Sequence, residues 1–221
     1  TNSDGTINLT EGSTDIGGTR ASVAMQAAEV LGIDSEDVIP AVVDTDSIAY
    51  TSGTGGSSVT FKTGWAAFKA ANDLKNQMIK RASLIWDVEK NSIELVDGLF
   101  KSKVDSALHM TFKELAQQLN STGGPIVGRS AVNATGVGAA FAGCIADVHV
   151  DPDTGKVDVL RFTIVQDAGK AIHPSYVEGQ MQGGAVQGIG WALNEEYFMS
   201  DEGTMLNSSF LDYRMPTSLD L

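Results

Sequence analysis

The chain has 221 residues, a formal net charge of −13 at pH 7 and a single cysteine, Cys144. Its apolar content of 42% is that of an ordinary globular protein, long enough for one sizeable domain or two small ones. The acidic balance argues against nucleic acid or an anionic membrane as partner, because both demand a basic surface. One cysteine excludes an intramolecular disulfide and a cysteine-ligated iron–sulfur cluster, and it fits a cytoplasmic setting. No segment reads as a membrane span or an export signal.

The first half of the sequence alternates short strands, glycine-rich loops and helices. Helical spacing of apolar residues, N-cap residues and Gly32 as a stop signal set the boundaries. The expected elements are a strand at 6–11, a loop at 12–18, a helix at 19–31, a strand at 38–44, a loop at 51–58 and a helix at 59–85. The last helix carries apolar side chains at core-like spacing, which predicts that they pack inside: Phe61, Trp65, Phe68, Leu74 and Met78.

The second half contains the clearest strand pair. Asp97-Gly98 is a common hairpin turn, and Thr111 with Glu114 has the spacing of a capping box. The expected elements are strands at 93–96 and 100–103, a helix from the capping box to 119, strands at 142–150 and 157–166, and a helix at 174–197. We expect an α/β (α+β) fold with two lobes, residues 1–125 and 126–221. Both ends have the character of a cut within a longer polypeptide.

The helix expected at 174–197 is unusual because it contains five glycines, each costing about 1 kcal/mol relative to alanine. Gln180, Gly184, Gln187 and Trp191 fall near one face, which combines amide groups with bare backbone. This face invites close approach by a polar group. The alternative is a helix crossing, in which small residues only let two backbones touch.

Each glycine-rich loop of the first half, at 12–18 and 53–57, directly precedes a helix. Free backbone N–H groups and the positive end of the helix dipole favour an anionic group at such a place. Neither loop has the spacing of a Walker loop or a clean dinucleotide fingerprint, and glycine-rich turns before helices are common. Taken together with the glutamine-rich helix, however, the two loops predict a cradle for an extended polar ligand that bears phosphates.

The remaining polar residues receive structural interpretations. His149 lies two residues from Asp147 and from Asp151 along a strand, but a solvated polar face accounts for this spacing better than a metal site does. We therefore predict no metal site built from protein side chains. Asp15 is expected to form hydrogen bonds within its loop, and Cys144 is expected to be a small buried apolar residue.

A series of motifs, taken in order, resembles one family, the molybdenum hydroxylases that include xanthine dehydrogenase, aldehyde oxidase and carbon monoxide dehydrogenase. The resemblance is to the carboxy-terminal molybdopterin-binding portion of the large subunit. It covers nearly the whole chain and is vaguest at about 80–127. The matching segments are 15–20, 26–33, 44–46, 53–57, 150–155, 166–174, 178–190, 195–196 and 212–217.

The resemblance implies an oxidoreductase that hydroxylates a carbon of a small-molecule substrate, an aldehyde, a purine or an N-heterocycle, with water. It implies two lobes of mixed sheets with helices packed on one face. Molybdenum would be held by molybdopterin, in some relatives its cytosine dinucleotide form, and not by side chains. Iron–sulfur and flavin (FAD) groups would lie on other domains or subunits of an oligomer. The cofactor-binding residues it implies are Gly17, Gly18, Thr19, Gly55, Gly56, Ser57 and Gln180.

The chain departs from the family pattern at two loop positions. Gly17-Gly18-Thr19 stands where many relatives have Gly-Gln-Gly, so a glutamine contact is lost or replaced, and Ser58 stands where many have arginine. The family's catalytic glutamate is expected beyond Leu221, so we assign no catalytic residue and expect the isolated chain to be inactive. The alternative from a different class is a cofactor-free interaction or scaffold domain whose glycines serve packing.

Overall fold

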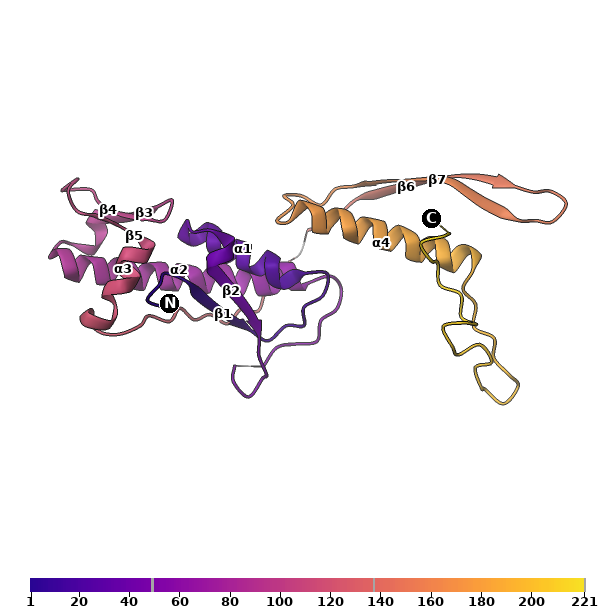
Figure 1. The fold of residues 1–221 in the computed structure, drawn as a ribbon, viewed down its shortest axis with the longest axis horizontal. Helices are drawn as coiled ribbons and strands as arrows, with labels where there is room; N and C mark the ends of the chain where they lie inside the picture. The colour runs from indigo at the N-terminus through magenta and orange to yellow at the C-terminus, as the bar shows by residue number, and fades with distance from the viewer. Residues whose placement is uncertain (49, 137, 221) are drawn as a thin grey trace. The chain divides into compact units, whose positions relative to one another are not determined.

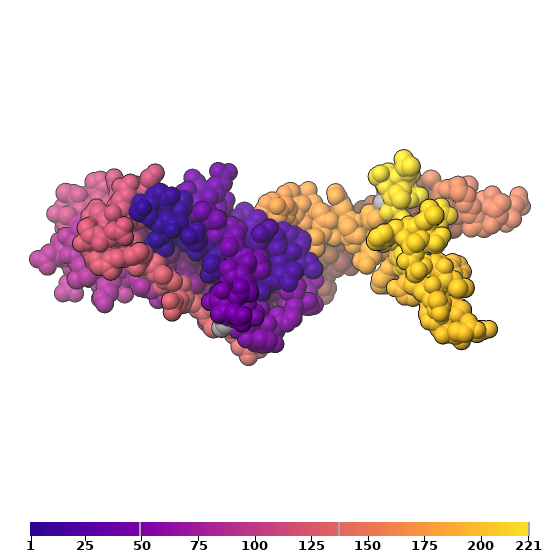
Figure 2. Space-filling model, turned by 60° about the horizontal axis from the view of Figure 1, so that its bottom comes forward, coloured from indigo at the N-terminus to yellow at the C-terminus, as the bar shows by residue number. Residues whose placement is uncertain are grey.

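A computed structural model describes residues 1–48, 50–136 and 138–220, and the chain divides into two units, residues 1–137 and 138–221 (Figure 1). The first unit combines helices with two small sheets, and the second combines one helix with a two-stranded sheet, which confirms the predicted α/β class. The contacts place the boundary after residue 137, whereas the sequence places it after residue 125. Ile126 explains the difference, because its side chain is buried in the first unit's core and its carbonyl accepts a 3.0 Å hydrogen bond from the amino group of Thr1. In Figure 2 the indigo amino-terminal residues accordingly lie against the pink segment near residue 120.

The first unit begins with a parallel strand pair. Strands β1 (Ile7–Glu11) and β2 (Val38–Val42) pair in register from Ile7–Val38 to Glu11–Val42, and helix α1 (Thr19–Leu31) connects them. Helix α2 (Val59–Trp86) follows β2 and runs the length of the unit in Figure 1. Since both strands run the same way, the loops that follow them leave the same edge of the sheet. The predicted boundaries of α1 are confirmed at both ends.

A second, three-stranded antiparallel sheet covers the far part of α2. Its strands are β3 (Ile93–Val96), β4 (Leu99–Ser102) and β5 (His109–Thr111), followed by helix α3 (Phe112–Gln118). The predicted hairpin and capping box are confirmed, whereas β5 was not predicted. The core of the unit lies between α1, α2 and this sheet, and its largest fully buried side chains are Phe100, Leu31, Met78, Leu115 and Val23.

The prediction that the aromatic residues at the start of α2 pack in the core is wrong. Phe61, Trp65 and Phe68 are 39%, 44% and 42% exposed, whereas Leu74 and Met78 are buried as predicted. The buried stripe of α2 is instead occupied near its start by small residues, Gly64, Ala67 and Ala71, which allow α1 to approach closely. The aromatics lie beside that stripe, where Trp65 stacks on Phe68.

The second unit consists of a long antiparallel ribbon and one helix. Strands β6 (Ala142–Val150) and β7 (Val157–Gln166) match the predicted ranges, and helix α4 (Pro174–Leu193) ends four residues before the predicted Tyr197. Among the described residues of this unit only Gly190 and Asn207 are buried. Cys144 is exposed, so its predicted burial is wrong. Within the described ranges, no helix has the length and apolar character needed to cross a membrane.

Candidate functional site

The first glycine loop turns from β1 into α1 through two left-handed residues. Gly17 and Gly18 have φ angles of 61° and 74°, a region that residues with a Cβ rarely adopt. Thr19 closes the loop, because its N–H donates to the carbonyl of Ile16 at 3.3 Å and its Oγ1 accepts from the N–H of Ile16 at 3.2 Å. The tip is thus formed by bare backbone held in one conformation.

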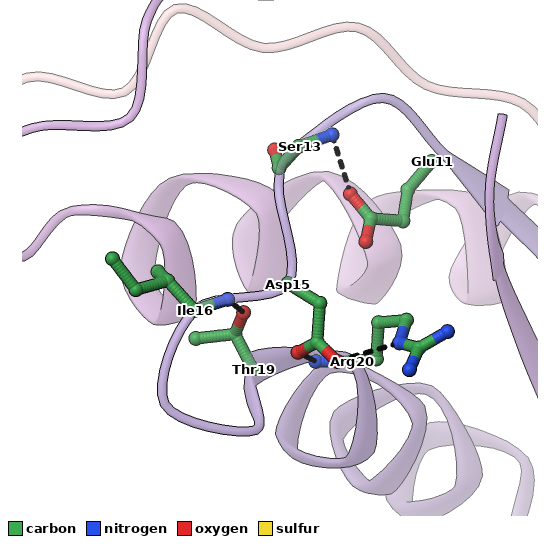
Figure 3. Close-up of polar contacts among 6 residues, drawn as sticks. All are labelled: Glu11, Ser13, Asp15, Ile16, Thr19 and Arg20. Atoms are coloured by element: carbon green, nitrogen blue, oxygen red, sulfur yellow. Dashed lines mark hydrogen bonds and ion pairs between the residues drawn. The ribbon is translucent and has the colours of Figure 1, made fainter. Parts of the chain in front are cut away.

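Asp15 caps α1 from outside the helix (Figure 3). Its carboxylate accepts hydrogen bonds from the backbone N–H of Arg20 at 3.1 Å and from Arg20 Nε at 2.7 Å. The hydrogen bond from the Arg20 N–H, with help from the guanidinium, lowers the pKa of Asp15 below its ordinary value. The predicted loop hydrogen bonding of Asp15 is confirmed. Its carboxylate also occupies the helix start, which sequence reasoning had left open for an anionic ligand.

The donors left for a ligand at this loop are those of its tip. Among the hydrogen bonds of the described residues, none is donated by the backbone N–H of Gly17 or Gly18. Successive backbone N–H groups in a turn can form a concave site for an anionic oxygen. The loop therefore keeps two adjacent backbone N–H groups, those of Gly17 and Gly18, without an acceptor among the described residues.

The second glycine loop leads from β2 into α2 and is also left-handed at its tip. Gly56 and Ser57 have φ angles of 62° and 54°, and Ser58 Oγ donates to the carbonyl of Gly55 at 2.9 Å. A Cβ built on Gly53, Gly55 or Gly56 would meet nothing within 4 Å. The packing of the chain itself therefore gives no reason for glycine at 53 and 55, whereas close approach by a ligand would.

The two loops lie next to each other. Thr51 Oγ1, just before the second loop, donates to the carbonyl of Gly12 at 3.1 Å, and Ser13 Oγ lies 2.5 Å from Oγ1 of Thr63, the fifth residue of α2. These contacts follow from the parallel pairing of β1 and β2, which brings both strand ends to one edge. The structure thus brings the starts of the two glycine loops together at one edge of the first unit.

Gln180 belongs to the second unit, on the polar face of α4. Gln180, Gly184 and Gln187 are exposed, as the sequence predicts, while Met181, Ala185 and Ile189 turn toward Phe162 and Ile164 of β7. A Cβ on Gly179, Gly183, Gly184 or Gly188 would meet nothing within 4 Å. These glycines therefore do not serve a helix crossing within the unit. In the described part of the chain no group of three or more His, Cys, Asp or Glu side chains is placed to hold a metal ion.

Sequence reasoning missed Glu11, the last residue of β1. Glu11 is only 8% exposed, and its Oε2 accepts a 2.7 Å hydrogen bond from the N–H of Ser13 at the start of the first loop (Figure 3). Burial raises the pKa of Glu11 above its ordinary 4.5, against the opposing hydrogen bond from Ser13. The signal was present in the alternation of the strand, which places Glu11 on the same face as buried Ile7.

The raised pKa of Glu11 has a defined effect on stability. Because the folded state favours the protonated carboxyl, Glu11 lowers the free energy of unfolding progressively as pH rises from 4.5 through its raised pKa. Glutamine cannot ionise. We therefore expect the free energy of unfolding of Glu11→Gln to rise relative to that of the wild type as the pH increases from 4.5 to 7. Urea unfolding at several pH values checks this, with exposed Glu36→Gln as the control. A Glu11→Gln difference that stays constant with pH would contradict it.

Comparison with known proteins assigns the chain first to a class, the cofactor-binding domains of molybdenum enzymes. Residues 1–221 match the family model of the molybdopterin cofactor-binding domain, and the chain belongs to this family. It is 32% identical to the xanthine dehydrogenase molybdenum-binding subunit of Escherichia coli O157:H7, over 100% of this chain and 30% of that protein. It is 31% identical to the carbon monoxide dehydrogenase large chain of Afipia carboxidovorans, over 92% of this chain and 26% of that protein.

Solved structures agree with this assignment. Quinoline 2-oxidoreductase from Pseudomonas putida 86 is similar with a TM-score of 0.86 and 27% identity, covering 100% of this chain and 29% of that one. Carbon monoxide dehydrogenase from Oligotropha carboxidovorans is similar with a TM-score of 0.85 and 27% identity, and the match covers 99% of this chain and 28% of that one. The resemblance to molybdenum hydroxylases is confirmed. The chain spans about three tenths of the length of the curated relatives it matches.

Proposed function

We propose that this chain forms part of the molybdopterin site of a cytoplasmic molybdenum hydroxylase acting on an aldehyde, a purine or an N-heterocycle. The residues proposed to contact the pterin, its pyrophosphate or, in the cytosine dinucleotide form, its cytidine are Gly17, Gly18, Thr19, Gly55, Gly56, Ser57 and Gln180. When bound, the cofactor supplies the redox centre for hydroxylation of a carbon with oxygen from water. Iron–sulfur and flavin groups on other domains or subunits of the oligomer carry the electrons onward.

One observation carries the proposal: two glycine loops begin at one sheet edge, the first with free backbone donors at its tip and the second with empty space at its tip. Gly17 and Gly18 offer N–H groups to a phosphate oxygen, and the space beside Gly55 and Gly56 admits a bulky group. Thr19 is already bonded within its loop, so its role is to hold the tip in shape. The residues present therefore fit an extended anionic cofactor.

The cofactor-free scaffold alternative makes a different demand on the glycines. If they served packing within the chain, a Cβ on each would collide with neighbouring atoms of the chain. Gly64 and Gly190 do meet close neighbours, but the glycines of the second loop and most of those of α4 do not. This contrast favours close approach by a ligand over packing.

Gly56→Asp tests the proposed site in the complete protein that carries these residues. A carboxylate there would repel a pyrophosphate and block its approach, so we expect molybdenum and pterin content to fall at least about tenfold. Gly155→Asp is the matched control, because Gly155 has the same left-handed backbone and the same empty surroundings in the β6–β7 turn. Metal analysis and pterin fluorescence measure the content. Wild-type protein without molybdenum and pterin would favour the scaffold alternative.

A further inference from the structure

The last residue of β1 and the two residues after it are all held by hydrogen bonds, two of which reach other segments of the first unit. Glu11 accepts the N–H of Ser13 at 2.7 Å, the carbonyl of Gly12 accepts Thr51 Oγ1 at 3.1 Å, and Ser13 Oγ pairs with Thr63 Oγ1 at 2.5 Å. All three contacts are half-buried. The base of the first loop is therefore fixed, while its tip at Gly17 and Gly18 is free to meet a ligand.

Gly12 shows how closely this base is fitted to the chain beside it. A Cβ on Gly12 would lie 2.7 Å from Ile48 Cδ1 and 2.9 Å from Thr51 Cγ2. The backbone of Gly12 thus packs against side chains of the segment that leads into the second loop. A residue with a Cβ fits there only if the side chains of Ile48 and Thr51 move aside.

Thr63 links the first loop to helix α2. It is the fifth residue of α2, the helix that follows the second loop, so its bond to Ser13 joins the base of the first loop to the start of that helix. The hydroxyl pair links residues fifty positions apart in the sequence. Two loops whose bases are held by hydrogen bonds and whose tips are exposed are preorganised to bind one ligand, because little conformational freedom is lost on binding.

We propose that Ser13 and Thr63, with Glu11 behind Ser13, are positioning residues that hold the two glycine loops at a fixed separation, so that both engage the same anionic cofactor. This inference rests on the proposed function and adds residues that contact no ligand themselves. The separation of the loops then determines how long the cofactor stays bound, because one loop alone offers only part of its donors.

The test is a double-mutant cycle in the complete, cofactor-loaded protein. Ser13→Ala and Thr63→Val each remove one hydroxyl, and Ser83→Ala is the matched control, since Ser83 Oγ donates to the carbonyl of Val88 at the opposite end of α2. The rate at which molybdenum and pterin are lost during dialysis is compared with the melting temperature. We expect Ser13→Ala and Thr63→Val to release cofactor about three to ten times faster. The double variant should release no faster than either single variant.

Ser83→Ala should lower the melting temperature by a similar amount and leave the release rate at the wild-type value. If Ser13→Ala and Thr63→Val release cofactor no faster than Ser83→Ala, the positioning role is wrong while the proposed function stands. Independent, additive effects of the two variants would also overturn it. If Thr63→Val does not fold, Ser13→Ala in the surface loop decides by the same comparison. Wild-type protein that contains neither molybdenum nor pterin would remove the proposed function itself.

Discussion

Replacing Gly32 by alanine is expected to lower the free energy of unfolding of the first unit by about 3 kcal/mol or more. Gly32 ends α1 with a φ angle of 67°, which alone costs a residue with a Cβ about 1 kcal/mol. The larger part comes from packing. A Cβ there would lie 2.8 Å from the Cα of Asp97 and closer still to the backbone nitrogen of Gly98, in the β3–β4 turn. Backbone cannot move aside as a flexible side chain can.

Urea unfolding of wild type and variant measures the difference. Gly56→Ala is the control within the same unit, because Gly56 has a φ angle of 62° but nothing within 4 Å of its Cβ position. It should cost only the conformational part, about 1 kcal/mol. Gly98→Ala should behave like Gly32→Ala, since its Cβ would meet the carbonyl oxygen of Gly32. Equal costs for Gly32→Ala and Gly56→Ala would show that the helix end and the turn are not tightly packed.

Gly32 also illustrates what sequence predicts well. Its role as a helix stop is local, because glycine accepts a left-handed φ angle whatever surrounds it. The capping box of Thr111 and Glu114 is local in the same sense, and both of its hydrogen bonds are present. Neither signal reveals that Gly32 touches Gly98, which lies in a different element. The contact that makes Gly32 most costly to replace could be found only in the structure.

The wrong predictions share a physical cause, which is that burial depends on partners that spacing does not identify. Phe61, Trp65 and Phe68 have core-like spacing, but the small residues beside them form the contact with α1. Cys144 lies in an apolar strand, yet a two-stranded ribbon leaves it exposed. Strand β5 is only three residues long, and it forms because β4 offers it an edge.

For the candidate site, the glycine loops and their position before helices were predictable, because both depend on neighbouring residues. The missing part was Glu11 with the Ser13–Thr63 bond, which depends on how β1 and α2 pack. The sequence also predicted that a ligand would interact with the positive end of the α1 helix dipole. In the structure the Asp15 carboxylate lies there and accepts the N–H of Arg20. The competition between a ligand and the chain's own carboxylate is a three-dimensional property.

The largest effect is expected when the two units are separated. Residues 138–221 alone should show no cooperative unfolding transition, whereas residues 1–137 alone should keep one. All buried apolar side chains of the described residues lie in the first unit, from Ile7 to Ile126. In the second unit Phe141, Leu160 and Val165 are 70%, 69% and 68% exposed. A two-stranded ribbon with one helix and so little burial cannot offset the conformational entropy lost on folding.

Urea titrations of both pieces, followed by far-ultraviolet circular dichroism, check this expectation. Residues 1–137 should give a sigmoidal curve, and residues 138–221 a gradual one together with strong binding of a hydrophobic dye, because apolar side chains such as Phe141 stay accessible. Each piece serves as the control for the other, since both derive from one sequence. A sigmoidal curve for residues 138–221 would contradict the argument, because it would mean that the β6–β7 hydrogen-bond ladder stabilises the ribbon with almost no apolar burial.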